Sequence, residues 1–129
     1  MADKKGTGYM KITTFNPKIV AKDAESAVRL FEELGFEKRH ELSVVDGMNI
    51  TNYRMKDANG FYVDISGVEI IPRDMTTIRI NVDDFDEAYG MLTARGLKAV
   101  RDIVETETNK TVMMAAPSGF LIDLCHHKK

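Results

Sequence analysis

Asp57-Ala-Asn-Gly-Phe-Tyr-Val-Asp-Ile65 returns in the second half of the chain as Ala116-Pro-Ser-Gly-Phe-Leu-Ile-Asp-Leu124. The residues before each stretch repeat as well. Residues 18–23 lead into a helix pattern, and residues 79–83 lead into a second one. The spacing between these two segments is similar to the spacing between the two stretches quoted above. A repeat of this length is a supersecondary unit used twice. The sequence therefore predicts two similar modules in tandem.

The first module covers about residues 11–66 and is predicted to be a strand, a helix and three strands. Residues 11–22 alternate and are rich in β-branched side chains, which is typical of a strand. Asp23 is a natural N-cap, and Gly35 suits the end of the helix that follows. Residues 36–45 and 48–56 are predicted strands joined by a hairpin turn at Asp46-Gly47, and Asn59-Gly60 turns the chain into residues 61–66.

The second module covers about residues 76–126, after a linker at 67–75 that contains Gly67 and Pro72. Residues 76–82 are a predicted strand, Asp83 or Asp84 caps the next helix, and Gly96 ends it. Further strands are expected near 98–105, 111–116 and 120–126. We therefore predict one α+β domain of 129 residues, made of two βαβββ modules.

Composition limits the function classes. The 43% hydrophobic and 29% charged fractions are those of a globular protein, and a net charge of −2 argues against a nucleic-acid partner. The sequence has no apolar run long enough for a membrane span, and the residues at its start lack the apolar core of a signal peptide. Cys125 is the single cysteine, which fits a reducing compartment. We expect a cytoplasmic protein.

Two tandem copies of strand-helix-strand-strand-strand resemble the vicinal oxygen chelate superfamily, which includes glyoxalase I, bleomycin-resistance proteins and extradiol dioxygenases. The resemblance covers about residues 11–126 and is carried by the paired Asn-Gly-Phe-Tyr-Val-Asp64 and Ser-Gly-Phe-Leu-Ile-Asp123, together with the helix starts around Asp23 and Asp84. It implies curved mixed sheets around a cup that binds a small molecule, with the helices outside.

Alternation along the strands assigns side chains to the two faces. The apolar set is expected to pack under the helices and comprises Phe15, Pro17, Ile19, Ala21, Phe61, Val63, Ile65, Ile78, Ile80, Val82, Phe120, Ile122 and Leu124. The set expected to line the cup comprises Asn16, Lys18, Tyr62, Asp64, Thr77, Arg79, Asp123 and Cys125.

The resemblance also implies where a metal would bind. Metal-using members of the superfamily take ligands at positions that correspond here to Asn16, Asp64, Thr77 and Asp123, and none of these residues is a histidine. Lys18 and Arg79 lie on the same faces, so we expect the two aspartates to pair with these cations or with a polar ligand, without a metal. If a divalent cation does bind, oxygen ligands favour Mg²⁺, Mn²⁺ or Ca²⁺ over Zn²⁺.

Other ionisable side chains are weaker candidates. Cys125 and His127 share the face of Asp123, but His126 and His127 are expected to form a frayed, solvated end. His40 could serve as a general base at the mouth of the cup, although a plain surface histidine is the favoured interpretation.

Two function classes remain open. The first is a glyoxalase/bleomycin-resistance-like protein that binds a small organic molecule without a histidine-ligated metal. The alternative is a divalent-metal-dependent lyase, isomerase or dioxygenase that acts on a vicinal-oxygen substrate. In either class we expect a homodimer, because the sheet edges of such small modules are otherwise exposed.

Overall fold

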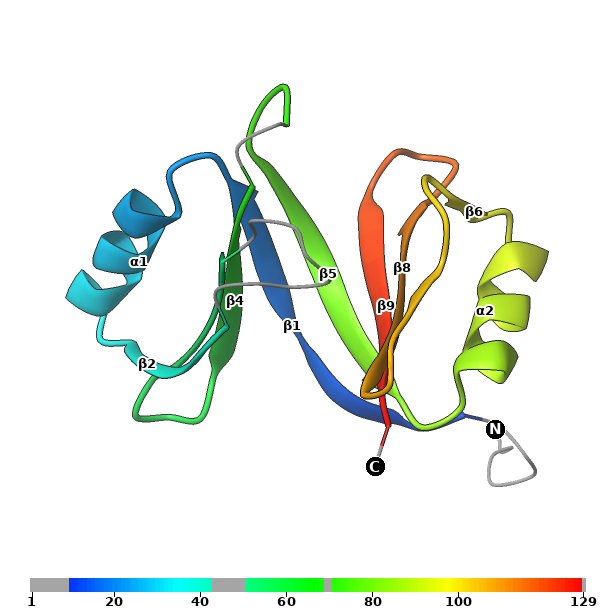
Figure 1. Ribbon diagram of the computed structural model, residues 1–129, viewed down its shortest axis with the longest axis horizontal. Helices are drawn as coiled ribbons and strands as arrows, with labels where there is room; N and C mark the ends of the chain where they lie inside the picture. The colour runs from blue at the N-terminus through cyan, green and yellow to red at the C-terminus, as the bar shows by residue number, and fades with distance from the viewer. Residues whose placement is uncertain (1–9, 43–50, 69–70, 129) are drawn as a thin grey trace. The chain divides into compact units, whose positions relative to one another are not determined.

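The computed structural model describes residues 10–42, 51–68 and 71–128, and within them it contains two helices and nine strands (Figure 1). The chain divides into two compact units, which we name by their helices. The α1 unit comprises Asn16–Ile78, and the α2 unit comprises Met1–Phe15 with Arg79–Lys129. The chain therefore passes between the units within its first strand and again within its fifth, which are β1 (Ile12–Ala21) and β5 (Met75–Val82).

The α1 unit has the predicted strand-helix-strand-strand-strand order. After β1 come α1 (Ala24–Glu33), β2 (Glu37–Leu42), β3 (Thr51–Lys56) and β4 (Tyr62–Gly67). Its strands lie in the order β2-β3-β4-β1, with β1 parallel to β4 and the other neighbours antiparallel. The sheet is therefore mixed, as predicted. The hairpin turn expected at Asp46-Gly47 lies outside the described residues.

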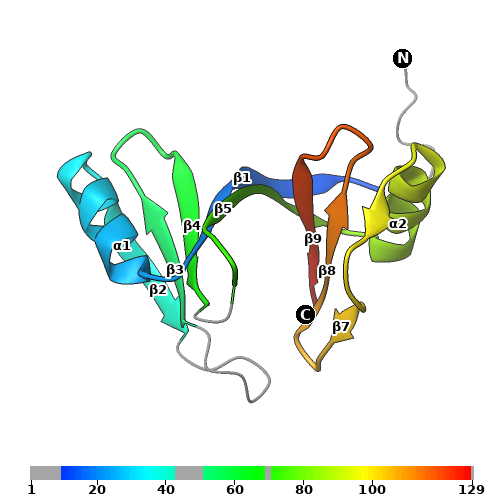
Figure 2. The ribbon, with the colours of Figure 1, turned by 90° about the horizontal axis from the view of Figure 1, so that it is seen from above.

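The α2 unit follows the same order with one difference. After β5 come α2 (Phe85–Ala94), β6 (Lys98–Ala99), β7 (Val104–Glu105), β8 (Asn109–Ala115) and β9 (Leu121–His127). Strand β8 pairs with β9, and both β6 and β7 pair with β8 (Figure 2). The single strand expected near 98–105 is therefore two short strands.

The repeated turns have the same hydrogen bonds in both units. In the first turn the Asp57 N–H donates to the Phe61 carbonyl at 3.0 Å, and the Gly60 N–H donates to the Asp57 carbonyl at 3.2 Å. The equivalent bonds from Ala116 to Phe120 and from Gly119 to Ala116 are both 2.9 Å. Gly60 and Gly119 have φ of 88° and 106°, a conformation that favours glycine. The sequence repeat is therefore a structural repeat.

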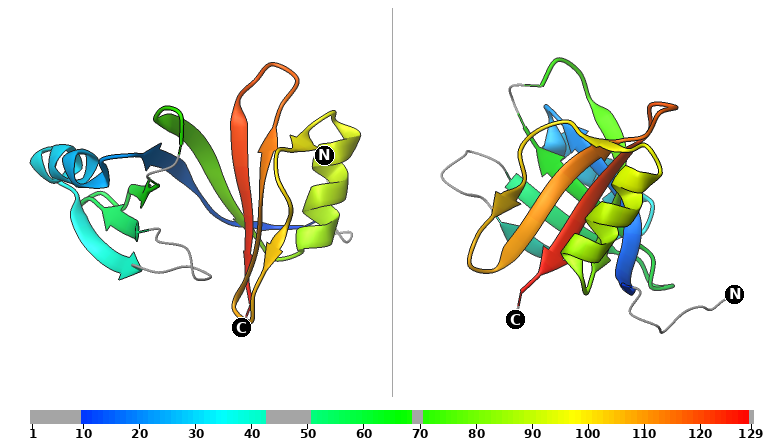
Figure 3. Two further views of the ribbon diagram at one scale, coloured as in Figure 1. Left: turned by 45° about the horizontal axis from the view of Figure 1, so that its top comes forward. Right: turned by 90° about the vertical axis from the view of Figure 1, so that its right-hand side faces the viewer.

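Each helix packs on one face of its own sheet and encloses a separate core (Figure 3). The core of the α1 unit consists of Ala24, Val28, Tyr53, Met55, Val63 and Ile65. The core of the α2 unit includes Val82, Phe85, Ala88, Val112, Met114, Ile122 and Leu124. The predicted helix-facing residues Val63, Ile65, Ile122 and Leu124 are confirmed. None of the helices in the described part of the chain is long and apolar enough to cross a membrane.

Four residues of the predicted apolar set are exposed instead of packed. Phe15, Phe61 and Phe120 are 63%, 65% and 51% exposed, and Pro17 is exposed as well. Phe61 and Phe120 each follow a turn glycine and precede the first residue of a strand, so they lie beyond the end of the sheet. The pairing of β1 with β4 begins at Lys18, so Pro17, which has no N–H to donate, precedes it.

Candidate functional site

The face of the α1 sheet opposite its helix is polar. Tyr53 and Met55 on β3, like Val63 and Ile65 on β4, belong to the core under α1. Because successive side chains of a strand point to opposite faces, the residues between them lie on the other side of the sheet. We call this side the polar face; it comprises Asn16, Lys18, Glu37, Asn52, Arg54, Lys56, Tyr62, Asp64 and Ser66.

Asp64 lies at the centre of the polar face and is 4% exposed. Arg54 stands directly opposite it in the pairing of β3 with β4, and its Nη1 donates to the two carboxylate oxygens at 3.2 and 3.1 Å. The Nδ2 of Asn16 donates to Oδ2 of Asp64 at 2.8 Å. A buried carboxylate needs such partners, because removing a charge from water is costly.

The Arg54 guanidinium also lies over an aromatic ring. Its Cζ is 4.2 Å from the centroid of Tyr62, and Nζ of Lys56 is 5.4 Å from the same centroid. The ring and the Asp64 carboxylate therefore hold the guanidinium from two directions. This constrains a side chain that is otherwise costly to order.

Other polar side chains of the α1 unit are also bonded or buried. The Ser66 hydroxyl donates to Oδ1 of Asn52, its direct neighbour on β3. Asn16 Oδ1 and Thr77 Oγ1 are buried and have no hydrogen-bond partner within the described residues. Asn16 and Thr77 are 3% and 1% exposed. Buried polar atoms without a partner are uncommon in folded proteins.

The corresponding face of the α2 unit has a different chemistry. In the repeat, the positions equivalent to Asn52, Arg54, Lys56, Tyr62, Asp64 and Ser66 are Thr111, Met113, Ala115, Leu121, Asp123 and Cys125. The pairing of β8 with β9 matches that of β3 with β4, so Asp123 stands opposite Met113 where Asp64 stands opposite Arg54. The repeat therefore keeps the carboxylate and replaces the arginine with an apolar side chain.

The C-terminal histidines are ordered parts of β9, so the prediction of a frayed end is wrong. Nδ1 of His126 lies 2.9 Å from the Val82 carbonyl oxygen, and Nδ1 of His127 lies 3.1 Å from Oδ1 of Asn109. The Cys125 thiol is buried and lies 3.7 Å from the Asp123 carbonyl oxygen. Backbone pairing with β8 up to His127 explains why the strand continues.

The eight predicted site residues are divided between the two units. Those in the α1 unit are Asn16, Lys18, Tyr62, Asp64 and Thr77, and those in the α2 unit are Arg79, Asp123 and Cys125. Of the predicted site residues in the α1 unit, those on the polar face are Asn16, Lys18, Tyr62 and Asp64. The side chain of His40 lies outside the described residues.

Arg54, Lys56 and Asn52 were missed in the sequence analysis. The prediction used alternation in the first and last strands of each module and did not extend it to the strand at 48–56. The run Asn52-Tyr53-Arg54-Met55-Lys56 alternates between polar and apolar side chains, and it would have placed all three residues on the polar face.

The contacts of Asp64 do not fit a divalent-cation site. Its carboxylate already accepts from Arg54 and Asn16, so a cation there would have to displace a guanidinium or lie beside it. Within the described residues, no group of three or more His, Cys, Asp or Glu side chains is arranged to hold a metal ion.

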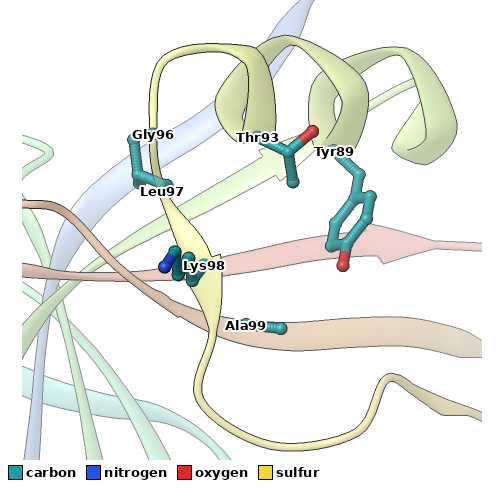
Figure 4. A pocket seen from close by; sticks show the side chains of 6 residues that line it. All are labelled: Tyr89, Thr93, Gly96, Leu97, Lys98 and Ala99. Atoms are coloured by element: carbon teal, nitrogen blue, oxygen red, sulfur yellow. The ribbon is translucent and has the colours of Figure 1, made fainter.

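A pocket of about 460 Å³ lies on the helix side of the α2 unit. It is lined by Tyr89 and Thr93 of α2 and by residues 96–99, the last two of which form β6 (Figure 4). It contains none of the eight predicted site residues, so it is separate from the polar face.

The fold matches several solved structures. A methylmalonyl-CoA epimerase from Mycobacterium tuberculosis is 15% identical, with a TM-score of 0.69 over 92% of this chain and 90% of that one. A glyoxalase/bleomycin resistance protein/dioxygenase superfamily member from Vibrio splendidus 12B01 is 18% identical, with a TM-score of 0.59 over 90% and 99%. A glyoxalase I variant from Zea mays is 16% identical, with a TM-score of 0.67 over 92% of this chain and 44% of that one.

These similarities confirm the predicted fold. The chain has the fold of the vicinal oxygen chelate superfamily, and at such identities the likeness concerns the fold alone. No protein-family model and no curated protein sequence matches the chain.

Proposed function

We propose that this chain binds a small organic molecule at the polar face of its α1 unit, without a histidine-ligated metal. The proposal depends on one observation: the buried Asp64 carboxylate is held by Arg54 and Asn16 on the sheet face opposite α1. A buried charge network seldom adds net stability to a fold, because its desolvation is costly. This favours a binding role for the network. The structural similarity to a glyoxalase/bleomycin resistance protein/dioxygenase superfamily member supports the same function class.

A ligand screen tests this proposal directly. The purified protein is screened by thermal shift against neutral, cationic and anionic small molecules, and each ligand found is titrated while amide chemical shifts are followed by NMR. We expect the largest changes at Asn16, Arg54 and Tyr62. Tyr62→Leu, which copies Leu121 of the repeat, should weaken binding, whereas Lys98→Ala beside the separate pocket should not. Ligands whose shifts cluster around Tyr89 and Lys98 would refute the polar face as the site.

The alternative is a divalent-metal-dependent lyase, isomerase or dioxygenase. It is favoured by the equivalence of Asp64 and Asp123 in the repeat, since both are nearly buried and occupy the positions where the resemblance implies carboxylate ligands. Two of the similar structures are a methylmalonyl-CoA epimerase and a glyoxalase I, which gives this class a further reason for testing. Stoichiometric Mg²⁺, Mn²⁺ or Ca²⁺ in the purified protein, lost in both Asp64→Asn and Asp123→Asn, would establish the metalloenzyme and reject the first proposal.

We further propose a cytoplasmic homodimer that does not bind nucleic acid. Self-association would remove the exposed Phe15, Phe61 and Phe120 side chains from water, which would supply part of its driving force. Sedimentation at micromolar concentration is expected to give twice the mass of the 14.5 kDa chain. A protein that sediments with the mass of one chain would contradict the dimer.

A further inference from the structure

The donor groups of Arg54 define what kind of molecule the polar face can hold. Only Nη1 of this side chain takes part in the hydrogen bonds found among the described residues, and both of these bonds go to Asp64. The Nε and Nη2 groups lie on other edges of the same planar guanidinium. The side chain is 23% exposed, so the guanidinium is held in place and is still accessible to solvent.

Two contacts fix the direction of these donors. Asp64 binds one edge of the guanidinium, and the Tyr62 ring lies against its plane with 4.2 Å between Cζ and the ring centroid. An arginine held in this way loses little conformational entropy when it forms further hydrogen bonds. Its Nε–H and Nη2–H groups form the fork that matches the two oxygens of a carboxylate.

The charge around Arg54 favours an anion. Asp64 neutralises one positive charge, and Lys56 adds another over the same Tyr62 ring, with Nζ 5.4 Å from the centroid. Among the described side chains, the polar face contains three cations, Lys18, Arg54 and Lys56, and two carboxylates, Asp64 and Glu37, which leaves one positive charge in excess. A ligand with one negative charge complements this face without the larger desolvation cost of a dianion.

We infer that the ligand of the polar face is a small organic carboxylate, anchored through Nε and Nη2 of Arg54. This inference rests on the proposed function and adds the chemical class of the ligand and the residue that selects it. A comparison of the two modules also supports this inference. Met113 occupies the position equivalent to Arg54, and Ala115 occupies the position equivalent to Lys56, so the second module lacks both cations there. The anion anchor is therefore a property of one module, not of the repeated scaffold.

The experiment compares each acid with its own amide. Lactate, benzoate and mandelate, with lactamide, benzamide and mandelamide, are titrated into the full chain at constant ionic strength, and binding is followed by calorimetry and NMR. We expect at least one acid to bind about tenfold or more tightly than its amide, since charge-assisted hydrogen bonds distinguish the two. Inorganic phosphate is titrated in parallel to distinguish a carboxylate from a phosphoryl group.

Three variants assign the effect to a residue. Arg54→Met copies Met113 and should abolish the preference for acid over amide. Arg54→Lys keeps the charge and the partner of Asp64 while losing the fork, so it should fold even if Arg54→Met does not and should still lose most of the preference. Lys22→Met removes one exposed cation from the same unit and should leave the preference unchanged.

The other possible outcomes would reject either the carboxylate assignment or the proposed function. The carboxylate assignment is wrong if all three acids bind no better than their amides, if phosphate binds better than the acids through Arg54, or if Arg54→Lys retains the full preference. A protein that binds neutral compounds at the polar face and ignores acids would keep the proposed function and lose only this inference. Failure of every compound in the broad screen would instead reject the proposed function.

Discussion

Arg54 and Asp64 face each other across two antiparallel strands, and this single pair determines much of what the polar face can do. The carboxylate is nearly buried, with 5% of its side chain exposed, whereas the guanidinium has 23% exposed. Both charged groups are partly removed from water, so each of them needs the other to offset its lost hydration. Part of the arginine is still available to solvent or to a ligand.

Asp64→Asn should destabilise the fold by about 1–3 kcal/mol, because Arg54 then keeps its charge with a neutral partner in a partly desolvated place. The free energy of unfolding is measured by urea denaturation. The matched control is Asp86→Asn, since Asp86 has 87% of its side chain exposed and pairs with Lys110 at 3.2 Å on the surface. This control should cost less than about 0.5 kcal/mol. Equal losses in the two variants would show that burial of Asp64 contributes nothing.

Part of this site could be predicted from the sequence. The repeat and the alternation assigned Asn16, Tyr62 and Asp64 to one face, and the contacts of Asp64 and Tyr62 agree with that assignment. Pairing of Asp64 with Arg54 was not predicted, because it depends on the register between β3 and β4, and the expected pairing with Lys18 or Arg79 stays a prediction. Register follows from the turn and from the packing of both faces, and neither is visible in a single strand.

At the scale of secondary structure, the two helices begin in the same way. The Asp23 carboxylate accepts from the Ser26 N–H at 3.1 Å, and the Asp84 carboxylate accepts from the Glu87 N–H at 3.0 Å. Each bond satisfies an N–H that the first turn of a helix leaves without a backbone partner. The two caps therefore occupy equivalent positions of the repeat.

Asp84→Ala should lower the free energy of unfolding by about 1 kcal/mol through loss of the cap of α2. Asp84→Asn is the matched control, since its side-chain oxygen can still accept from the Glu87 N–H and the loss should be a few tenths of a kcal/mol at most. Chemical denaturation followed by circular dichroism measures both values. Asn and Ala variants of equal stability would refute the role of the cap.

The cap of α1 should make stability depend on acid. Hydrogen bonds from the Ser26 side chain, and then from its backbone N–H, hold the pKa of Asp23 below its usual value of 3.8. The folded state therefore binds this proton more weakly than the unfolded state does. The stabilisation is complete above the unfolded pKa and is lost as pH falls through the folded pKa.

Asp23→Asn keeps a capping oxygen without a titrating group, so its melting temperature should fall less than that of the wild-type protein between pH 4.5 and pH 2, both taken as approximate limits around the pKa. Calorimetric melting temperatures across this interval measure the difference. Parallel pH profiles for the two proteins would show that Asp23 does not contribute to acid sensitivity.

Sequence reasoning located the helices better than the strands near 98–105. Asp caps and terminal glycines are local signals, and both helices have them. Val100, Ile103 and Val104 favour a strand by composition, yet they are 53%, 40% and 38% exposed near the edge where β6 and β7 pair with β8. β-propensity depends on packing from neighbouring strands, so composition alone does not predict where an edge strand breaks.

At the scale of the whole molecule, the repeat made the fold predictable. Two pairs of matching segments in the sequence indicated two βαβββ modules, and the order of elements in both units and the similarity to solved structures confirm them. The function did not follow in the same way, because the repeat keeps Asp64 and Asp123 but changes Arg54 to Met113. Binding chemistry lies in those differences between modules, which no symmetry argument can supply. That both faces line one cup stays a prediction.

The two cores allow a test of whether the chain unfolds as the single domain that we predict. Met55 and Met114 are equivalent in the repeat, each is 0% exposed, and each belongs to the core of its own unit. Met55→Ala and Met114→Ala should each cost about 2–5 kcal/mol by leaving a cavity. In a single cooperative domain, both variants lower the temperature of one shared calorimetric transition. Two separate transitions, each lowered by only one of the variants, would show instead that the units unfold as independent domains.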